Sequence, residues 1–124
     1  MTIPKTLTKI GELAFAGCRA LTKVSIDQDF VGDTKLRTID SKAFLNCIRL
    51  SDTSFVETVR EFGTQAFYGC SGITEFIIPK DAFYYAGVLA NCNNLTKLTI
   101  PRIAVVDSSN PHIGQLFGSA DPDT

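Results

Sequence analysis

The most restrictive feature of this sequence is a motif that recurs four times around its cysteines. The copies read IGELAFAGCRALTKVSI, IDSKAFLNCIRLSDTSF, FGTQAFYGCSGITEFII and YYAGVLANCNNLTKLTI, and their cysteines are Cys18, Cys47, Cys70 and Cys92. Successive cysteines are 29, 23 and 22 residues apart. Such a period is typical of stacked repeat architectures, in which each unit buries its apolar face only against its neighbours.

Apolar residues recur at fixed distances from each cysteine, so the four copies align column by column. The columns hold Phe15, Phe44, Phe67 and Leu89 three residues before the cysteine, Ala14, Ala43, Ala66 and Val88 four before, Ile10, Ile39, Phe62 and Tyr84 eight before, Leu21, Leu50, Ile73 and Leu95 three after, Val24, Thr53, Phe76 and Leu98 six after, and Ile26, Phe55, Ile78 and Ile100 eight after. We expect these columns to point inward and to stack from unit to unit.

A further column consists only of glycine and asparagine. It lies immediately before the cysteine and holds Gly17, Asn46, Gly69 and Asn91. Both residue types tolerate a positive φ at little cost, glycine because it lacks a Cβ and asparagine because of local hydrogen bonding. We therefore predict that each unit turns in a left-handed conformation at this position.

The second half of each unit is predicted to be a strand. The segments LTKVSI, ITEFII and LTKLTI are rich in β-branched and aromatic residues, and Pro79 and Pro101 follow two of them. Equivalent strands should pair in a parallel sheet. A short second strand is expected around the Ile10 column, and the segment between it and the cysteine is long enough only for a tight turn or a short 3₁₀ helix.

The pattern IGxxAFxGCxxLTxxxIP resembles the BspA-like leucine-rich repeat of bacterial surface proteins. The resemblance covers residues 3–101 and weakens in the fourth copy, where Tyr84 and Tyr85 replace the Ile10–Gly11 pair. It implies one mainly β, right-handed leucine-rich-repeat solenoid over residues 1–124, with short parallel strands, tight turns and little helix. Units are expected at about 7–26, 36–55, 59–79 and 83–101, with an exposed insertion near 27–35 and a tail, 102–124, that resembles longer divergent units.

Several classes of function find no support in the sequence. The net charge is −1 without a basic stripe, which argues against nucleic acid, and no apolar run approaches the length of a membrane span. Metal ligands lie close together in sequence, unlike these cysteines, so we predict buried reduced thiols rather than disulfides, a metal site or a cofactor. The only histidine is His112, near Ser108 and Ser109, and no catalytic motif accompanies it, so an enzyme is not expected.

The outward positions of the predicted strands are the candidate contact residues. They are Lys23, Asp52, Glu75 and Lys97 in one row and Ser25, Ser54, Ile77 and Thr99 in the next, and we name them the outward-face residues. They are either solvated ladder positions, with Lys23–Asp52 and Glu75–Lys97 charge pairs, or the face that binds a partner. No aromatic residue is concentrated there, which favours the solvated alternative.

Tyr85 is a separate candidate, because it occupies a column that holds Gly11, Asp40 and Gly63 in the other units. Its ring either projects toward solvent as a contact residue or is tucked under the tail as a cap, and we favour the cap. Tyr84 belongs to the inward column and should be mostly buried.

The family resemblance implies a non-catalytic adhesion or recognition module of a larger bacterial surface protein, located outside the cell. Its partner would be a protein or a glycan. A structural spacer that holds another domain, with no partner of its own, is the alternative. The chain begins with TIP, as at the close of a preceding strand, and ends without a new unit, so we expect it to be part of a longer array.

Overall fold

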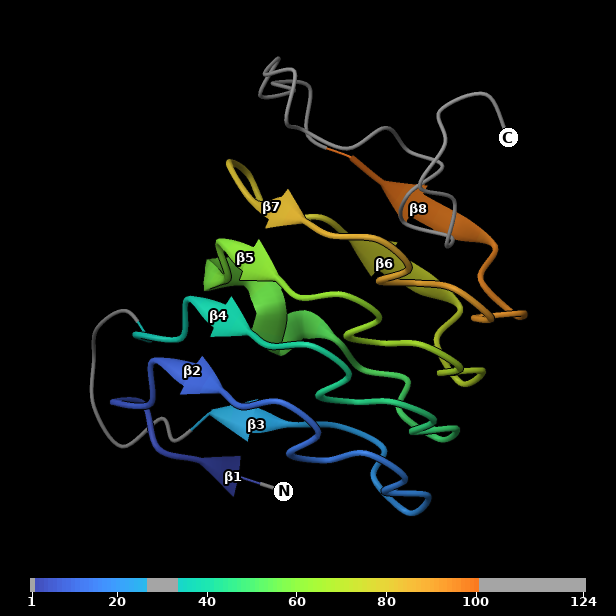
Figure 1. The fold of residues 1–124 in the computed structure, drawn as a ribbon, viewed down its shortest axis with the longest axis horizontal. Helices are drawn as coiled ribbons and strands as arrows, with labels where there is room; N and C mark the ends of the chain where they lie inside the picture. Colours follow the sequence, from blue (N-terminus) through green and yellow to red (C-terminus); the bar gives the residue numbers. More distant parts are fainter. Residues whose placement is uncertain (1, 27–33, 101–124) are drawn as a thin grey trace.

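The computed structural model describes residues 2–26 and 34–100, which form a stack of short strands and tight turns (Figure 1). The strands are β1 (Thr2–Ile3), β2 (Lys9–Ile10), β3 (Ser25–Ile26), β4 (Thr38–Ile39), β5 (Glu61–Phe62), β6 (Glu75–Ile77), β7 (Phe83–Tyr84) and β8 (Lys97–Thr99). Within the described ranges the only helix is a 3₁₀ helix, η1 (Ser54–Thr58), so the mainly β prediction is confirmed. Most of the predicted insertion, Pro101, the tail and His112 lie outside the described residues.

One sheet, which we name the continuous sheet, takes a strand from every unit. Its order is β2-β4-β5-β7, all pairs are parallel, and the register places Ile10, Ile39, Phe62 and Tyr84 side by side. These are the residues of the predicted second strand, which is confirmed. All four side chains are buried, so this column faces the core.

The other sheet, which we name the interrupted sheet, consists of two separate pairs, β1 with β3 and β6 with β8. A single parallel bridge between Lys23 and Asp52 joins units one and two. The prediction of a strand at this place in each unit is therefore wrong for unit two, where the chain enters η1 instead. The cause is local: Asp52 Oδ1 accepts hydrogen bonds from Ser54 N at 3.0 Å and from Ser54 Oγ at 2.7 Å, which closes a turn.

The turn segments before the cysteines contain two left-handed positions in each unit. The predicted column is confirmed, with φ of +73° at Gly17, +57° at Asn46, +74° at Gly69 and +58° at Asn91. A second left-handed column lies five residues before each cysteine, and it holds Leu13, Lys42, Gln65 and Gly87. Three of these four are not glycine, so composition gave no sign of this column.

These turn segments are joined by a regular ladder of backbone hydrogen bonds. In units one and two, Leu13 N donates to Ser41 O at 3.2 Å, Phe15 N to Ala43 O at 2.8 Å and Gly17 N to Leu45 O at 2.7 Å. The same three bonds recur between units two and three and between units three and four. The segments thus stack as closely as strands do, although they are built of consecutive turns.

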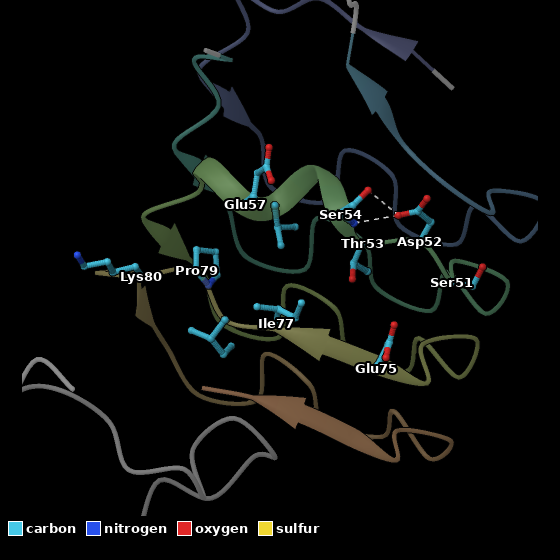
Figure 2. Close-up of a pocket in the computed structure, with 11 residues that line it drawn as sticks. Ser51, Asp52, Thr53, Ser54, Glu57, Glu75, Ile77, Pro79 and Lys80 are labelled. Carbon is cyan, nitrogen blue, oxygen red and sulfur yellow. Dashed lines mark hydrogen bonds between the residues drawn. The ribbon is translucent and has the colours of Figure 1, made fainter. Parts of the chain in front are cut away.

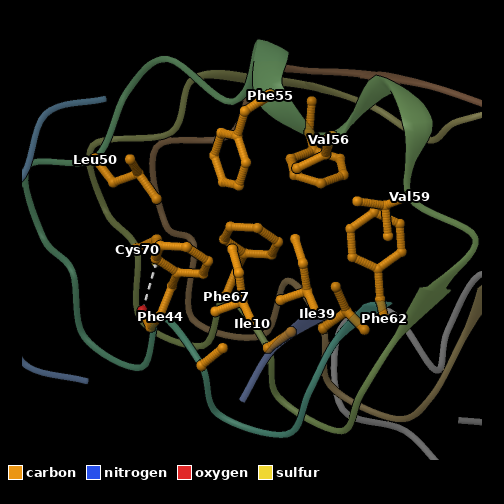
Figure 3. Close-up of a cluster of buried hydrophobic side chains, with 14 of the residues drawn as sticks. Ile10, Ile39, Phe44, Leu50, Phe55, Val56, Val59, Phe62, Phe67 and Cys70 are labelled. Carbon is orange, nitrogen blue, oxygen red and sulfur yellow. Dashed lines mark hydrogen bonds between the residues drawn. The ribbon is translucent and has the colours of Figure 1, made fainter. Parts of the chain in front are cut away.

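The phenylalanine column forms the centre of the core. The ring of Phe44 lies 5.2 Å from that of Phe15 and 5.1 Å from that of Phe67, stacked in both cases. Figure 3 shows Phe44 and Phe67 within the buried cluster, with Phe55 of η1 facing them. The Phe44 and Phe55 ring centroids are 5.5 Å apart, so η1 still supplies an inward ring where the strand is missing.

Most members of the predicted inward columns are buried in the middle units, where Thr53 is the half-buried exception. Phe44, Phe67, Ala43 and Ala66 are fully buried. In unit one, however, Ala14 is exposed and Phe15 is half-buried, and in unit four Ile100 is 36% exposed. The prediction that every member of these columns is buried is therefore wrong at the outer units, because each inner unit is covered on two sides by neighbours.

The cysteine column is held by its thiols as well as by packing. Cys47 Sγ donates to Phe15 O at 3.0 Å, Cys70 Sγ to Phe44 O at 3.1 Å and Cys92 Sγ to Phe67 O at 3.2 Å. The four cysteines are free thiols, and three of them are buried, whereas Cys18 is only half-buried. Each thiol after the first therefore bonds to the unit before it.

Candidate protein-binding face

The outward-face residues lie on the interrupted sheet and on η1. All of them are exposed except Ser25, which is half-buried. The register pairs Glu75 with Lys97 and Ile77 with Thr99, and the bridge pairs Lys23 with Asp52. The two rows are therefore aligned as predicted, except at Ser54, which begins η1 rather than extending the row from Ser25.

The two predicted charge pairs do not form salt bridges. In the part of the chain that the structure describes, the one salt bridge joins Lys9 Nζ to Asp40 Oδ2 at 3.2 Å, at the continuous sheet. Asp52 instead accepts the two hydrogen bonds from Ser54. These bonds, with a smaller contribution from the charge of Lys23, lower the pKa of the Asp52 carboxyl below its ordinary value.

A groove of about 530 Å³ opens where η1 displaces the strand of unit two, and we name it the η1–β6 groove. One wall consists of hydroxyl and carboxyl side chains from unit two, namely Ser51, Asp52, Thr53, Ser54 and Glu57, with Val56 beside them. The other wall comes from β6 and the turn after it, and consists of Glu75, Ile77, Ile78, Pro79 and Lys80. Figure 2 shows the two walls facing each other, with η1 on one side and β6 on the other.

The groove combines an acidic rim with an exposed apolar side chain. Asp52, Glu57 and Glu75 supply three carboxylates against one cation, Lys80. Ile77 is 63% exposed, the largest exposed fraction among the large apolar side chains that the structure describes. The surface can therefore accept hydrogen bonds, attract positive charge and bury an apolar group at one place.

Four outward-face residues belong to this groove, namely Asp52, Ser54, Glu75 and Ile77. Lys23, Ser25, Lys97 and Thr99 lie outside its lining. The sequence thus located four of the eleven residues that line this groove, but it missed the contribution of η1. The SDTS segment, which is rich in turn-forming residues, was the signal that could have indicated it.

Tyr85 directly follows β7, the last strand of the continuous sheet. Its side chain is 51% exposed. The favoured prediction, a cap tucked under the tail, depends on residues that lie outside the described ranges. Its hydroxyl donates to Glu61 Oε2 at 3.3 Å, and the neighbouring Phe83 is 43% exposed. Tyr84, in contrast, is buried as predicted.

The cysteine column offers a packing role rather than a reactive one. Burial raises the pKa of the Cys47 and Cys92 thiols to about 11 and raises that of Cys70 further. Over residues 2–26 and 34–100, no cluster of histidine, cysteine, aspartate or glutamate could hold a metal ion. The same residues include no helix with the length and hydropathy of a membrane span.

Comparison with known proteins relates the chain to leucine-rich repeats. Residues 1–109 match the family model described as a BspA type leucine rich repeat region (6 copies). A leucine-rich cell surface protein of Faecalibacterium prausnitzii has a crystal structure that is similar to this fold, with a TM-score of 0.73 and 29% sequence identity. The match covers 81% of this chain and 26% of that protein, so the chain spans about a quarter of its length.

A second solved structure shares the fold. The leucine-rich-repeat protein TpLRR of T. pallidum aligns with a TM-score of 0.50 and 19% identity over 80% of this chain and 68% of that one. A search of curated protein sequences finds no significant match.

Proposed function

This chain belongs to the BspA type leucine-rich-repeat family, and we propose that it is a non-catalytic, protein-binding module of a larger bacterial surface protein. Adhesion or recognition outside the cell would be its role. The description of the similar F. prausnitzii chain as a cell surface protein supports this location. The match to only 26% of that chain supports a module of a larger protein.

The observation that carries the proposal is the η1–β6 groove on the outward face. A spacer needs only solvated side chains there, whereas this face has a hollow lined by three carboxylates and a largely exposed isoleucine. Exposed apolar surface surrounded by polar groups is typical of protein interaction sites. The groove lining has no aromatic side chain on which a sugar ring could pack, which favours a protein over a glycan as the partner.

The proposal can be tested with the chain immobilised on a sensor surface. A panel of purified extracellular matrix proteins and of free glycans is passed over it, and we expect saturable binding of at least one protein. The variant Glu57→Lys/Glu75→Lys should weaken that binding at least about tenfold, because a charge reversal on the rim repels what the parent attracts. Glu12→Lys, an exposed glutamate on the turn segment of unit one, is the matched control and should bind normally.

Absence of saturable binding to every protein in the panel would favour the structural spacer. If the Glu57→Lys/Glu75→Lys variant binds as tightly as the Glu12→Lys control, the binding function stands but the groove is not its site.

A further inference from the structure

The edge of β6 that faces unit two has no strand beside it. Thr74 O accepts from Thr96 N at 2.8 Å and Ile78 N donates to Thr99 O at 2.9 Å, so both residues are bonded to unit four. In a parallel pair, the residues that bond to one neighbour alternate with those that face the other side. The backbone N–H and C=O groups of Glu75 and Ile77 therefore point toward unit two.

Unit two does not satisfy these groups. Lys97 N donates to Thr74 O across units three and four, and Asp52 N donates to Thr22 O across units one and two, both at 3.2 Å. The equivalent bond from Glu75 N to unit two is missing, and among the described residues no backbone bond joins Glu75 or Ile77 to that unit. Because η1 leaves the sheet after Asp52, the place of one strand is open.

This open edge coincides with the η1–β6 groove, since Glu75 and Ile77 both line it. An unpaired strand edge is a template for the addition of an extended segment, whose backbone supplies the missing hydrogen bonds. The segment would lie between η1 and β6, beside the exposed side chain of Ile77 (Figure 2).

We infer that the η1–β6 groove binds an extended, basic segment of a partner protein by strand addition to the free edge of β6. Lysine or arginine side chains of the segment face the three carboxylates, and an apolar side chain packs on Ile77. Glu75 and Ile77 lie two residues apart on the same face of β6, so the basic and the apolar residue of the segment must also be two residues apart. This inference rests on the proposed function, because it specifies the chemistry of the protein partner.

The probe for this inference is the six-residue peptide Lys-Thr-Val-Thr-Lys-Thr, acetylated and amidated at its ends, which places its lysines and its valine on one face of an extended strand. It is titrated into the full chain while backbone amides are followed by NMR. We expect saturable binding, with shifts and slowed hydrogen exchange at the amides of Glu75 and Ile77. The same peptide with glutamate in place of lysine should not bind, because its charges repel the rim.

Two further comparisons separate strand addition from simple charge attraction. Ile77→Pro removes one free donor of β6 without breaking a bond within the chain, and Ile77→Ala retains that donor, so the proline variant should bind at least about tenfold more weakly than the alanine variant. A peptide that is N-methylated at alternate residues keeps its charge and should lose binding to a similar extent. The peptide test does not depend on the folding of any variant.

Failure of the Lys-Thr-Val-Thr-Lys-Thr peptide to saturate the chain at about 1 mM, or equal binding of its N-methylated form, would overturn the inference. If a matrix protein nevertheless binds the chain in the sensor experiment, the proposed function stands and only the mode of binding is wrong. If neither the peptide nor any protein binds, both fail.

Discussion

The continuous and the interrupted sheets both pass through unit two, yet they respond differently to its sequence. Strand β4 of the continuous sheet pairs on both sides, with β2 and with β5. On the interrupted sheet, the corresponding segment of unit two makes one bridge and then turns into η1. The difference lies in the SDTS segment, where Asp52 and Ser54 close a turn through their side chains.

The comparison teaches that a repeat can lose a strand without losing its core. Phe55 of η1 is 4% exposed and lies against Phe44 and Phe67, so its ring fills the place of the inward strand residue. Only the backbone pairing of unit two in the interrupted sheet changes, and this sheet carries the outward-face residues. A variation that keeps the core and opens the surface is suited to the gain of a binding site.

The largest expected effect is that of removing the ring at the centre of the core, which lies against η1. Phe44→Ala should lower the free energy of unfolding by about 3–5 kcal/mol, because Phe44 is fully buried between two stacked rings and its loss leaves a cavity. Urea denaturation followed by circular dichroism measures this change. Phe83→Ala, the same substitution at an exposed ring, is the control and should cost less than about 1 kcal/mol. Similar losses for the two variants would contradict the central place of Phe44 in the core.

Thiol labelling tests whether the break in the interrupted sheet loosens unit two as a whole. Burial raises the pKa of Cys47 from 9.0 to about 11, which lowers its thiolate fraction near pH 8 by about a hundredfold. We expect Cys18, which is half-buried, to react with a thiol reagent much faster than Cys47, Cys70 and Cys92, as followed by mass spectrometry. If Cys47 reacts as fast as Cys18, the disturbance at η1 reaches the turn segment of unit two.

Gly63→Ala tests the close approach of units two and three at the continuous sheet. A Cβ at Gly63 would overlap the backbone of Asp40 and Ser41, so we expect a loss of about 1–3 kcal/mol in the free energy of unfolding. Gly11 occupies the same column in unit one, and a Cβ there meets no atom within 4 Å. Gly11→Ala is therefore the matched control, and an equal loss at both positions would contradict tight packing between these two units.

The smallest expected effect concerns the turn that begins η1. Ser54→Ala removes the hydrogen bond from Ser54 Oγ, the larger of the two that lower the pKa of Asp52, and keeps the one from Ser54 N, so this pKa should rise toward its ordinary value in an NMR titration. Because the pKa of Asp52 is depressed in the folded chain, the turn stabilises the fold at pH values above the unfolded pKa of about 3.9. This stabilisation is lost as the pH falls through the folded pKa. Solvent screening limits the gain to a few tenths of a kcal/mol. Asp40 is the control, and its titration should not change.

The sequence predicted the parts of the fold that depend on periodicity. The inward columns, the left-handed positions at Gly17 and Asn46, and the short strand around Ile10 all follow from residue types at fixed spacing. Leu13, Lys42 and Gln65 could not be predicted as left-handed, because such residues rarely adopt that conformation and are held there by the ladder to the next unit.

The candidate site was predicted only in part, for a different reason. Glu75 and Ile77 were identified as outward because a strand alternates its side chains. The groove beside them exists because unit two forms no strand in the interrupted sheet. Whether that strand forms depends on its competition with the Asp52–Ser54 turn. Column alignment with the other units hides this competition, because Phe55 keeps its apolar place in either conformation.

The turn-segment ladder gives the stack a direction. Leu13, Phe15 and Gly17 all present N–H groups to unit two, and Ser41, Ala43 and Leu45 all present C=O groups to unit one. At this side of the solenoid, every layer therefore has a donor face and an acceptor face, always in the same order. A two-fold axis that brought two like faces together would oppose donor to donor or acceptor to acceptor. Layers of this kind can be joined only head to tail, with the donor face of one layer against the acceptor face of the next.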